Sequence, residues 1–571
     1  MIVNSKNIIT EDIFVSKSKK KLKVIPLGGL MEIGKNITLF EYGDEIIIVD
    51  CGVIFPEDDM LGIDLVIPDF TYLVKNKEKV KALFLTHGHE DHIGSTPYLL
   101  KKFNVPIYGT KLTLGLLEHK LEEHNLLASS QLNVVTPGQK ITIGSFVVEF
   151  IATTHSIADS VALAIHTPVG IVVHTSDFKI DYTPIEGQSI DLARFAELGK
   201  QGVLLLLADS TNVEEKGYTV SERTVGETFN KLFLGAQGRI IVATFASNVH
   251  RIQQIINSAI KNNRKVAFSG RSMLNVLDVA SKLGYMKIPE GVLIDIDQVK
   301  NYPLDKIVMI TTGSQGEPMS ALSRMAASMH RQIDILPGDT VIMSSSTIPG
   351  NEKTISKVIN ELFKKGAEVI YESIAEVHVS GHACQEELKI IHSLVKPKFF
   401  MPVHGEYKHL KLHANLAENL GISKENIFIS DLGKVLELTA TSAKITTSVP
   451  SGRVFVDGLG IGDVGSVVLR DRKLLSEDGL IIVVLTLEAG TGNIVAGPDV
   501  ISRGFVYVKE SERLMDQVRE ITKSSIYKLD SRKRADWASI KTAIRDNLRD
   551  YIYEKTKRKP MILPIIMEVS I

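Results

Sequence analysis

The chain has 571 residues, of which 44% are hydrophobic and 23% are charged, and its formal net charge is −1 at pH 7. This length predicts about three or four domains. The balanced charge excludes a strong overall field for a polyanion, so any nucleic-acid site must be a local groove. The two cysteines, Cys51 and Cys384, exclude a disulfide framework and a thiolate zinc site. We expect a cytoplasmic protein without membrane contact, because no apolar run approaches the roughly 18 residues of a membrane span.

The first 20 residues are predicted to form a loose arm, with a short basic run at 17–21 that is either solvated or in contact with nucleic acid. Three strands, separated by glycine-containing turns, are predicted next, at 23–27, 36–40 and 45–50. The third strand ends in Asp50. We expect its carboxylate at the same sheet edge as the motif that follows, and an Asx turn before Gly52 is the alternative.

The stretch 86–92, Thr-His-Gly-His-Glu-Asp-His, directly follows a predicted buried strand at 80–85. Loops at strand ends are common places for catalytic groups. Imidazole and carboxylate groups at this density suit Zn²⁺ or Mn²⁺ better than Ca²⁺, which takes oxygen ligands only. A solvated polar turn is the alternative. A helix predicted at 93–103 would begin near His92 and direct its N-terminus at the site.

Three later strands also end in metal-competent residues: His155, Asp177 and Asp209. Each of these residues alone would be an ordinary histidine or turn aspartate. The repetition at successive strand ends favours one shared metal site.

From about residue 220, helical stretches alternate with five short buried strands, at 238–244, 265–268, 306–310, 340–343 and 367–370. This alternation predicts a parallel sheet in a separate α/β domain inserted into the first domain. The strand ends are rich in small polar residues, for example at 247–248 and 344–346. They indicate an anion-lined face, and ordinary helix capping is the alternative.

After the insert come two histidine-containing stretches, 378–382 and 399–406, and the second is a buried strand ending in His404. The segment 458–465 contains a literal G-x-G-x-x-G. We expect no dinucleotide site there, because Ser466–Leu469 is strand-like where a helix is needed. The remainder is predicted as strand, strand, helix, helix, strand, with basic clusters at 532–534 and 557–559.

Together these residues resemble the metallo-β-lactamase superfamily, its β-CASP nucleases and the ribonuclease J family in particular. The longest matching stretches are 245–248, 313–318, 378–383 and 402–407. The resemblance implies an α/β fold: a metallo-β-lactamase αββα sandwich with an inserted β-CASP α/β domain and a small C-terminal α+β domain. The expected boundaries are 1–20 for the arm, 21–220 and 377–448 for the metallo-β-lactamase domain, 221–376 for the β-CASP domain, 449–475 for a linker and 476–571 for the C-terminal domain.

The resemblance implies two Zn²⁺ or Mn²⁺ ions per subunit. The first would be held by His87, His89 and His155, the second by Asp91, His92 and His404, with Asp177 bridging them. A shared hydroxide would attack the phosphodiester and leave 5′-phosphate and 3′-hydroxyl products. Asp50 and Asp209 would orient ligand histidines. His382 would hold the scissile phosphate and protonate the leaving oxygen, assisted by His378.

The resemblance also implies a 5′-monophosphate pocket, and hence a 5′→3′ exonuclease that also cuts internally, in RNA maturation and mRNA decay. The pocket residues would be Ser247, Asn248, Val249, His378, Val379, Ser380, Gly381 and His382. The insert would hinge to admit RNA. A structural Ca²⁺ is a further candidate, with Gly62, Asp64 and Asp457 around it.

RNA is the expected partner, in a homodimer or homotetramer that the C-terminal domain helps to assemble, with a paralogous subunit or other RNA-decay proteins as candidate partners. Three alternatives are a non-catalytic RNA-binding subunit of an RNA degradation complex, a DNA-directed β-CASP nuclease and a small-molecule hydrolase. The last has no need for the insert or for the stretch 378–382.

Overall fold

The computed structural model describes residues 20–57, 59–185, 187–317, 319–348, 351–505, 512–530 and 536–570. The predicted arm up to residue 19, most of the basic run at 17–21 and the cluster at 532–534 lie outside them. The chain divides into two compact units. The smaller comprises Phe55–Leu65 and Phe455–Ile571, and the larger contains the rest. No helix among the described residues is long and apolar enough to span a membrane.

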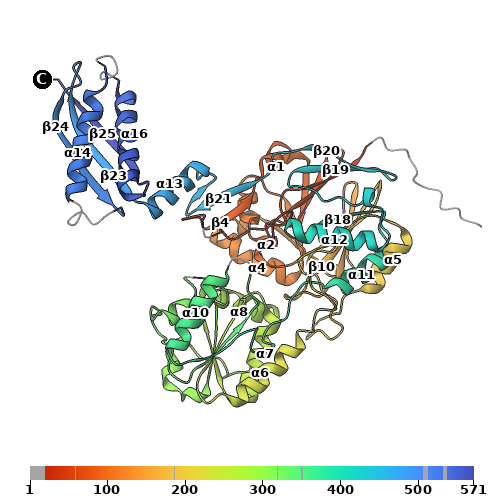
Figure 1. Cartoon of the computed structure of the whole chain (residues 1–571). Coiled ribbons are helices and arrows are strands. Elements are labelled where there is room, and N and C mark those ends of the chain that lie inside the picture. Colours follow the sequence, from red (N-terminus) through yellow and green to blue (C-terminus); the bar gives the residue numbers. More distant parts are fainter. Residues whose placement is uncertain are drawn as a thin grey trace, which may run out of the picture. The chain divides into compact units, whose positions relative to one another are not determined.

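Two sheets face each other in the larger unit (Figure 1). The first has the order β20-β19-β1-β2-β3-β5-β6-β7 and the second β18-β12-β11-β10-β9-β8. The strands of the first sheet are β1 Leu22–Pro26, β2 Thr38–Tyr42, β3 Glu45–Val49, β5 Val80–Phe84, β6 Pro106–Gly109, β7 Gln131–Val134, β19 Lys434–Leu438 and β20 Ala443–Ser448. Those of the second are β8 Lys140–Ile143, β9 Phe146–Ala152, β10 Val161–Thr167, β11 Gly170–His174, β12 Val203–Asp209 and β18 Phe399–Val403.

The inner faces of the two sheets share one hydrophobic core, in which Phe84 of β5 lies 6.0 Å from Phe150 of β9 between ring centroids. The outer face of the second sheet is covered by α5 Leu192–Gln201, α11 Gln385–Val395 and α12 Tyr407–Asn419. The larger unit also contains most of β4 Leu65–Pro68, the helices α1 Thr71–Lys75 and α4 Lys111–Glu123, and the 3-10 turns Lys77–Lys79, Leu127–Ser129 and Lys424–Asn426. The layered αββα sandwich is the predicted one.

Strand register brings the polar strand ends together. Val49 of β3 pairs with Phe84 of the parallel β5, so Asp50 and the motif after Leu85 leave the first sheet side by side. Asp209 of β12 pairs with Val403 of the parallel β18, which places it beside His404. Because carboxyl ends of parallel strands share one edge, residues more than 300 positions apart meet at one site.

The prediction of a single helix at 93–103 is wrong. Two short helices replace it, α2 Glu90–Ile93 and α3 Thr96–Leu100. The break falls at Gly94 and Ser95, and Pro97 in the first turn of α3 has no backbone N–H to continue the first helix. Helix α2 therefore begins inside the histidine motif, with His89 as its N-cap residue.

The inserted domain has the predicted parallel sheet, in the order β14-β15-β13-β16-β17. Its strands are β13 Ile240–Thr244, β14 Lys265–Ser269, β15 Ile307–Thr311, β16 Thr340–Ser344 and β17 Glu368–Ile370. Amphipathic helices cover both faces: α6 Arg223–Gly235, α7 Val249–Lys261 and α8 Arg271–Leu283 on one, α9 Ala321–Ala326 and α10 Glu352–Lys364 on the other. Two 3-10 turns, Ile296–Asn301 and Leu304–Lys306, precede β15.

The insert packs on the domain that carries the two facing sheets, through α4 and α8. Leu112, Ile157 and Ala158 of the first domain belong to the same buried apolar cluster as α6, α7 and α8. Tyr285 after α8 donates a hydrogen bond to Asp159. Any opening between the two domains must therefore leave this side closed or expose part of a hydrophobic core.

The smaller unit contains the three-stranded sheet β24-β23-β25, covered by two helices. Alternate residues of β23 Leu480–Glu488 are buried, which is the pattern of a sheet with one covered face. The elements are β24 Ile494–Arg503, α14 Glu512–Tyr527, α16 Trp537–Thr556 and β25 Met561–Val569. Within the described residues, the predicted order of strand, strand, helix, helix, strand is confirmed.

The strand predicted at Ser466–Leu469 is wrong, because the residues begin helix α13 Ser466–Glu477. Two β-branched valines suggested a strand, but neither is buried, and four charged residues follow at 470–473. A helix does follow the G-x-G-x-x-G. The preceding β21 Arg453–Asp457 pairs antiparallel with β22 Gly460–Ile461, and β23 after the helix lies in another sheet. The βαβ unit that a dinucleotide site needs is not formed here.

Candidate metal centre

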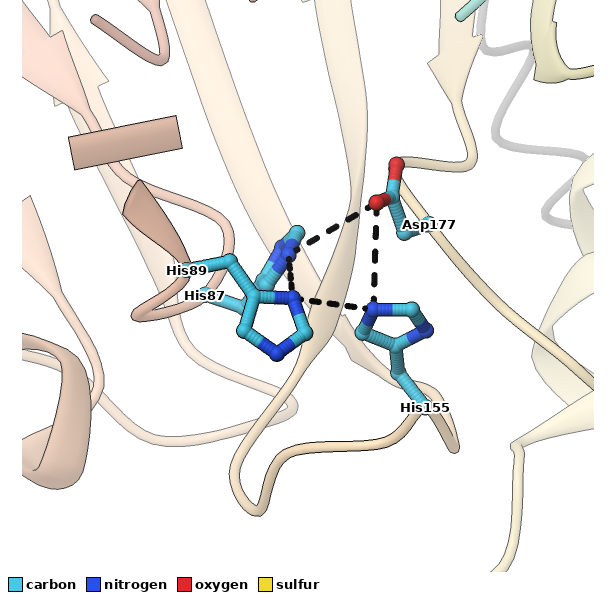
Figure 2. A group of neighbouring side chains, drawn as sticks. All are labelled: His87, His89, His155 and Asp177. Carbon is cyan, nitrogen blue, oxygen red and sulfur yellow. Dashed lines mark hydrogen bonds and ion pairs between the residues drawn. The ribbon is translucent and has the colours of Figure 1, made fainter. Parts of the chain in front are cut away.

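Four side chains from three loops form the first candidate ligand group (Figure 2). His87 and His89 follow β5, His155 follows β9, and Asp177 follows β11. Nδ1 of His89 lies 3.1 Å from Nε2 of His87 and 3.1 Å from Nε2 of His155. Oδ2 of Asp177 lies 3.7 Å and 3.8 Å from the same two Nε2 atoms. The four ligand atoms thus converge on one point.

The second group consists of Asp91, His92, Asp177 and His404. Nε2 of His92 is 3.2 Å from Oδ2 of Asp177 and 3.5 Å from Oδ2 of Asp91. Nε2 of His404 is 3.2 Å from Oδ2 of Asp91 and 3.7 Å from Oδ2 of Asp177. One oxygen of Asp177 therefore faces both groups.

The donor set fits divalent transition metals. Ligand atoms about 2.0–2.2 Å from a tetrahedral ion lie roughly 3.3–3.6 Å apart, and the distances in both groups are close to this. The groups contain five imidazoles and two carboxylates and no thiolate. This mixture suits Zn²⁺ or Mn²⁺.

Every ligand histidine has its second ring nitrogen near a polar partner, which fixes the ring. Nδ1 of His92 donates to Asp50 at 2.8 Å, and Nδ1 of His155 donates to the Gly381 carbonyl at 2.7 Å. Nδ1 of His404 lies 2.6 Å from the Thr211 hydroxyl. Such contacts direct the opposite nitrogen toward a metal.

Asp50 is held by the motif that it supports. The backbone N–H and the hydroxyl of Thr86 donate to its two oxygens at 2.8 and 2.9 Å. Asp50 also adopts a positive φ of 61°, a strained backbone that places its carboxylate under His92. The contacts fit the predicted orienting role.

The two groups differ electrostatically. Burial lowers the pKa of His89 to about 4, and it lowers the pKa values of His87 and His155 well below the ordinary range. These three rings stay neutral, which is the form that binds a metal. Burial also opposes charge on His404, but nearby carboxylates, Asp177 first, raise its pKa to about 10.

His92 behaves like His404. Burial disfavours its charged form, yet the carboxylates of Asp177 and Asp91 raise its pKa well above the ordinary value. Burial alone would raise the pKa of the Asp177 carboxyl. The charges of His404 and His92 outweigh burial and hold this pKa well below its ordinary value, so that Asp177 stays ionised. The carboxylates of the second group therefore favour positive charge there, whether on a protonated ring or on a bound cation.

His382 and Asp209 lie beside the second group. Both belong to a cluster with Asp177 and His404 whose ligand-type atoms are all within 4.8 Å of one another. Nδ1 of His382 donates to Oδ2 of Asp209 at 2.7 Å. Burial lowers the pKa of His382, but Asp209 outweighs burial and raises it above the ordinary value. Oδ1 of Asp209 also lies 3.4 Å from Nδ1 of His404, so this carboxylate is close to a ligand ring of the second group as well as to His382.

The stretch 378–382 is only partly at the metal centre. His382 and Gly381 touch it, whereas Nδ1 of His378 is 2.8 Å from the guanidinium of Arg251. The predicted pocket residue Asn248 is buried and caps α7, its side chain accepting from the Arg251 N–H at 3.0 Å. The capping role predicted as the alternative is therefore real at this loop.

Sequence reasoning missed two residues at the centre. Nδ2 of Asn36 lies 3.2 Å from Oδ2 of Asp91 and 2.9 Å from Nε2 of His92. Thr211 joins His404 to Asp209, with its hydroxyl 2.8 Å from Oδ1 of Asp209. Asn36 begins a predicted strand and Thr211 follows the end of another, but neither residue type is a usual metal ligand, so no pattern singled them out.

The calcium residues belong to the smaller unit. Oδ2 of Asp64 accepts the Gly458 N–H at 2.7 Å, and Asp457 is paired with Arg472 at 2.5 Å. Within the described ranges, neither aspartate belongs to a group of three metal-competent side chains. The calcium site stays a prediction.

Comparisons with known proteins cover nearly the whole chain. Residues 31–191 match the metallo-β-lactamase superfamily, 237–362 the ribonuclease J β-CASP domain, 366–430 the Zn-dependent metallo-hydrolase RNA specificity domain and 467–569 the ribonuclease J C-terminal domain. The chain belongs to the ribonuclease J family. It is a metal-binding hydrolase of the ribonuclease class, with RNA as substrate.

Two relatives illustrate the similarity. Ribonuclease J2 of Bacillus subtilis (strain 168) is 46% identical over 97% of this chain and 100% of its own length. Ribonuclease J 1 of Streptococcus pyogenes serotype M3 is 48% identical over 97% of this chain and 99% of its own length. A crystal structure of a protein of unknown function from Enterococcus faecalis V583 shares the fold, with a TM-score of 0.54 at 18% identity over 73% of this chain and 100% of that protein.

Proposed function

We propose that the chain is a 5′→3′ exoribonuclease that favours 5′-monophosphate RNA, also cuts RNA internally, and acts in RNA maturation and mRNA decay in the cytoplasm. One observation supports this most directly. Oδ2 of Asp177 lies 3.2–3.8 Å from ligand nitrogens of both candidate groups. A carboxylate shared in this way is the arrangement expected of a two-metal phosphodiesterase.

The proposed cofactors are two Zn²⁺ or Mn²⁺ ions. His87, His89, His155 and Asp177 would hold the first, and Asp91, His92, His404 and Asp177 the second. When bound, such ions act as Lewis acids on the phosphate and lower the pKa of water to about 7. The protein's part is to fix the ligand positions through the contacts of Asp50, Gly381 and Thr211.

His382 is the proposed proton donor. Asp209 occupies its Nδ1, so Nε2 is the nitrogen available to a phosphate oxygen. Its pKa is raised above the ordinary value, chiefly by Asp209 against the opposing effect of burial. A protonated ring can hold a non-bridging oxygen and pass its proton to the leaving 3′-oxygen.

The loop 378–382 is the proposed 5′-phosphate site, together with Ser247, Asn248 and Val249. Asn212 donates to the Ser380 hydroxyl at 2.8 Å, and Thr219 donates to the His382 carbonyl at 2.7 Å. A Cβ at Gly381 would lie 2.6 Å from the ring of His155, so only glycine fits there. A rigid loop in contact with a metal ligand could measure a fixed distance from an RNA end to the metals.

The proposed assembly is a homodimer or homotetramer, with a paralogous subunit or other RNA-decay proteins as further partners. Size-exclusion chromatography with light scattering would establish the number of subunits. A purified chain that stays monomeric at micromolar concentration would contradict this part of the proposal.

The function is tested with one labelled RNA carrying a 5′-monophosphate, a 5′-triphosphate or a 5′-hydroxyl. We expect mononucleotide release from the first and little from the second, with products ending in 5′-phosphate. Equal rates on all three ends would contradict the 5′-phosphate pocket. Absence of any turnover by metal-loaded protein would favour a non-catalytic RNA-binding subunit, and equal cleavage of a matched DNA strand would favour a DNA-directed enzyme.

A further inference from the structure

Arg251 in α7 is completely buried within the inserted domain. Its Nε and Nη2 atoms donate to the two oxygens of Glu222, both at 2.7 Å. This is a bidentate pair, the geometry in which arginine binds a carboxylate most strongly. Glu222 directly precedes α6, so the pair fixes the segment by which the chain passes into the insert.

The remaining donors of Arg251 reach two other segments. Nη1 donates to the Ser344 carbonyl at the end of β16 at 2.9 Å and to Nδ1 of His378 at 2.8 Å. Nη2 also donates to the Val379 carbonyl at 3.3 Å. A guanidinium has five N–H groups, and all five find an acceptor. One side chain therefore joins the segment before α6, the carboxyl end of β16 and the segment that leaves the insert.

These contacts determine the state of His378. Arginine has no acceptor atom, so Nδ1 of His378 must be the unprotonated nitrogen and the ring proton must be on Nε2. Burial first, then the charges of Arg251 and Lys179, lower the pKa of His378 to about 2. His378 is therefore a neutral hydrogen-bond donor held in one tautomer, and it cannot share the acid role proposed for His382.

We propose that Arg251 is a positioning residue for recognition of the RNA 5′ end: it fixes His378 as an Nε2–H donor and holds the backbone of the loop 378–382. This rests on the proposed function, in which that loop binds a 5′-phosphate. Lysine has a single ammonium group and cannot reproduce five N–H contacts in a planar fork. The recognition role therefore requires arginine at this position.

The inserted domain offers a matched control in Arg239. It too is buried, and its Nε and Nη2 donate to the two oxygens of Asp339 at 2.9 and 2.5 Å. Arg239 and Asp339 directly precede β13 and β16, at the amino ends of the sheet, whereas Ser344 is at a carboxyl end. Replacing either arginine disrupts a buried ion pair in the same domain, but only Arg251 contacts the proposed phosphate loop.

The experiment uses the full metal-loaded chain and one RNA with either a 5′-monophosphate or a 5′-hydroxyl. The readout is the ratio of kcat/KM for the two ends, compared among wild type, R251K and R239K. Loss of hydrogen bonds to a charged phosphate should reduce this ratio at least about tenfold in R251K. The ratio in R239K should equal that of wild type, because a general loss of stability affects both substrates alike.

A double-variant cycle tests whether Arg251 acts through His378. The R251K substitution should have little further effect on the ratio in an H378A background. Full additivity, or an unchanged ratio in R251K, would overturn the inference. If R251K does not fold, E222Q is measured in its place. This substitution weakens the bidentate pair but keeps the guanidinium, and its readout is the same ratio of kcat/KM for the two RNA ends. A wild-type enzyme that does not distinguish the two ends would instead overturn the proposed function.

Discussion

Oδ2 of Asp209 accepts the Nδ1 proton of His382 at 2.7 Å. Its Oδ1 atom accepts from the Thr211 hydroxyl at 2.8 Å, and that hydroxyl lies 2.6 Å from Nδ1 of His404. One carboxylate thus orients a ring of the second ligand group and the ring proposed to face the phosphate. In the proposed mechanism, metal binding and proton donation are therefore linked through Asp209.

Replacing Asp209 by asparagine should impair both roles. The amide cannot stabilise a protonated His382, and one of its two acceptor positions becomes a donor. We expect a 10–100-fold loss of cleavage rate, the usual effect of removing a partner of a metal ligand. Steady-state kinetics and metal affinity are measured in parallel. D516N, at an exposed position in α14, serves as the control, and a D209N enzyme with wild-type kinetics would contradict the linkage.

Loss of Asp177 should differ from loss of His87. Asp177 belongs to both ligand groups, whereas His87 belongs to the first alone. We expect D177A to reduce the content of both metals and H87A to retain the second, while both variants lose cleavage and remain folded. Metal analysis of purified protein with circular dichroism checks this. Full activity in either variant would contradict the two-metal proposal.

Asn36 should act on the second metal selectively. Its backbone N–H donates to the Asp91 carbonyl at 2.9 Å, and its Nδ2 lies 3.2 Å from Oδ2 of the same residue. Without the amide, Asp91 is less constrained, so we expect N36A to weaken the second metal about tenfold or more and to leave the first unchanged. Calorimetric titration of metal-free protein resolves the two steps. The control N133A removes an amide that donates to backbone carbonyls of β6 and β7, and equal effects of both variants would exclude a selective role.

Periodicity and strand-end residues were sufficient to predict most strands and the inserted parallel sheet, whereas the αββα sandwich was expected only from the resemblance to the metallo-β-lactamase superfamily. Buried strands are short apolar runs, and the ligands at their ends are of unusual types, so His155 and Asp177 could be linked to the histidine motif from the sequence. The helix α13 was missed because Val467 and Val468 favour a strand. The segment has no buried residues, so no sheet packing stabilises a strand there, and the residues form a helix instead. Whether the segment is exposed depends on the tertiary structure.

The contacts of Arg251 could not be predicted for a different reason. Arginine within an amphipathic helix is ordinarily a surface residue, and nothing in the local pattern marks Arg251 as buried. Its partners Glu222, Ser344 and His378 are 29, 93 and 127 positions away. Such contacts depend on the tertiary structure of the insert, which local sequence patterns do not specify.

Two buried histidines behind the second sheet should make the larger unit sensitive to acid. Nε2 of His392 lies 3.1 Å from Nε2 of His413, whose Nδ1 is 2.9 Å from the Ser210 hydroxyl. Burial lowers the pKa of His392 to about 4, and burial followed by the nearby His392 lowers that of His413 well below its ordinary value. Both rings are neutral in the folded chain at neutral pH.

The sign follows from proton binding. Below the ordinary pKa of about 6.5 the unfolded chain binds protons on both rings, whereas the folded chain does not, so stability falls as the pH falls from about 6.5 toward 4. Each histidine contributes about 1.4 kcal/mol per pH unit in this window. H392L should therefore lose less stability than wild type between pH 7.5 and 5.5. The control H119L, at a partly exposed position, should lose as much as wild type.

The measurement must report the larger unit, because the one tryptophan, Trp537, lies in the smaller unit. Urea-dependent hydrogen exchange of peptides covering β18 and α12, followed by mass spectrometry, meets this need, since Phe400 and His413 are in contact there. Labelling at one fixed pH after equilibration removes the intrinsic pH dependence of exchange. An equal shift of the urea midpoint in wild type and H392L would show that His392 binds a proton without unfolding.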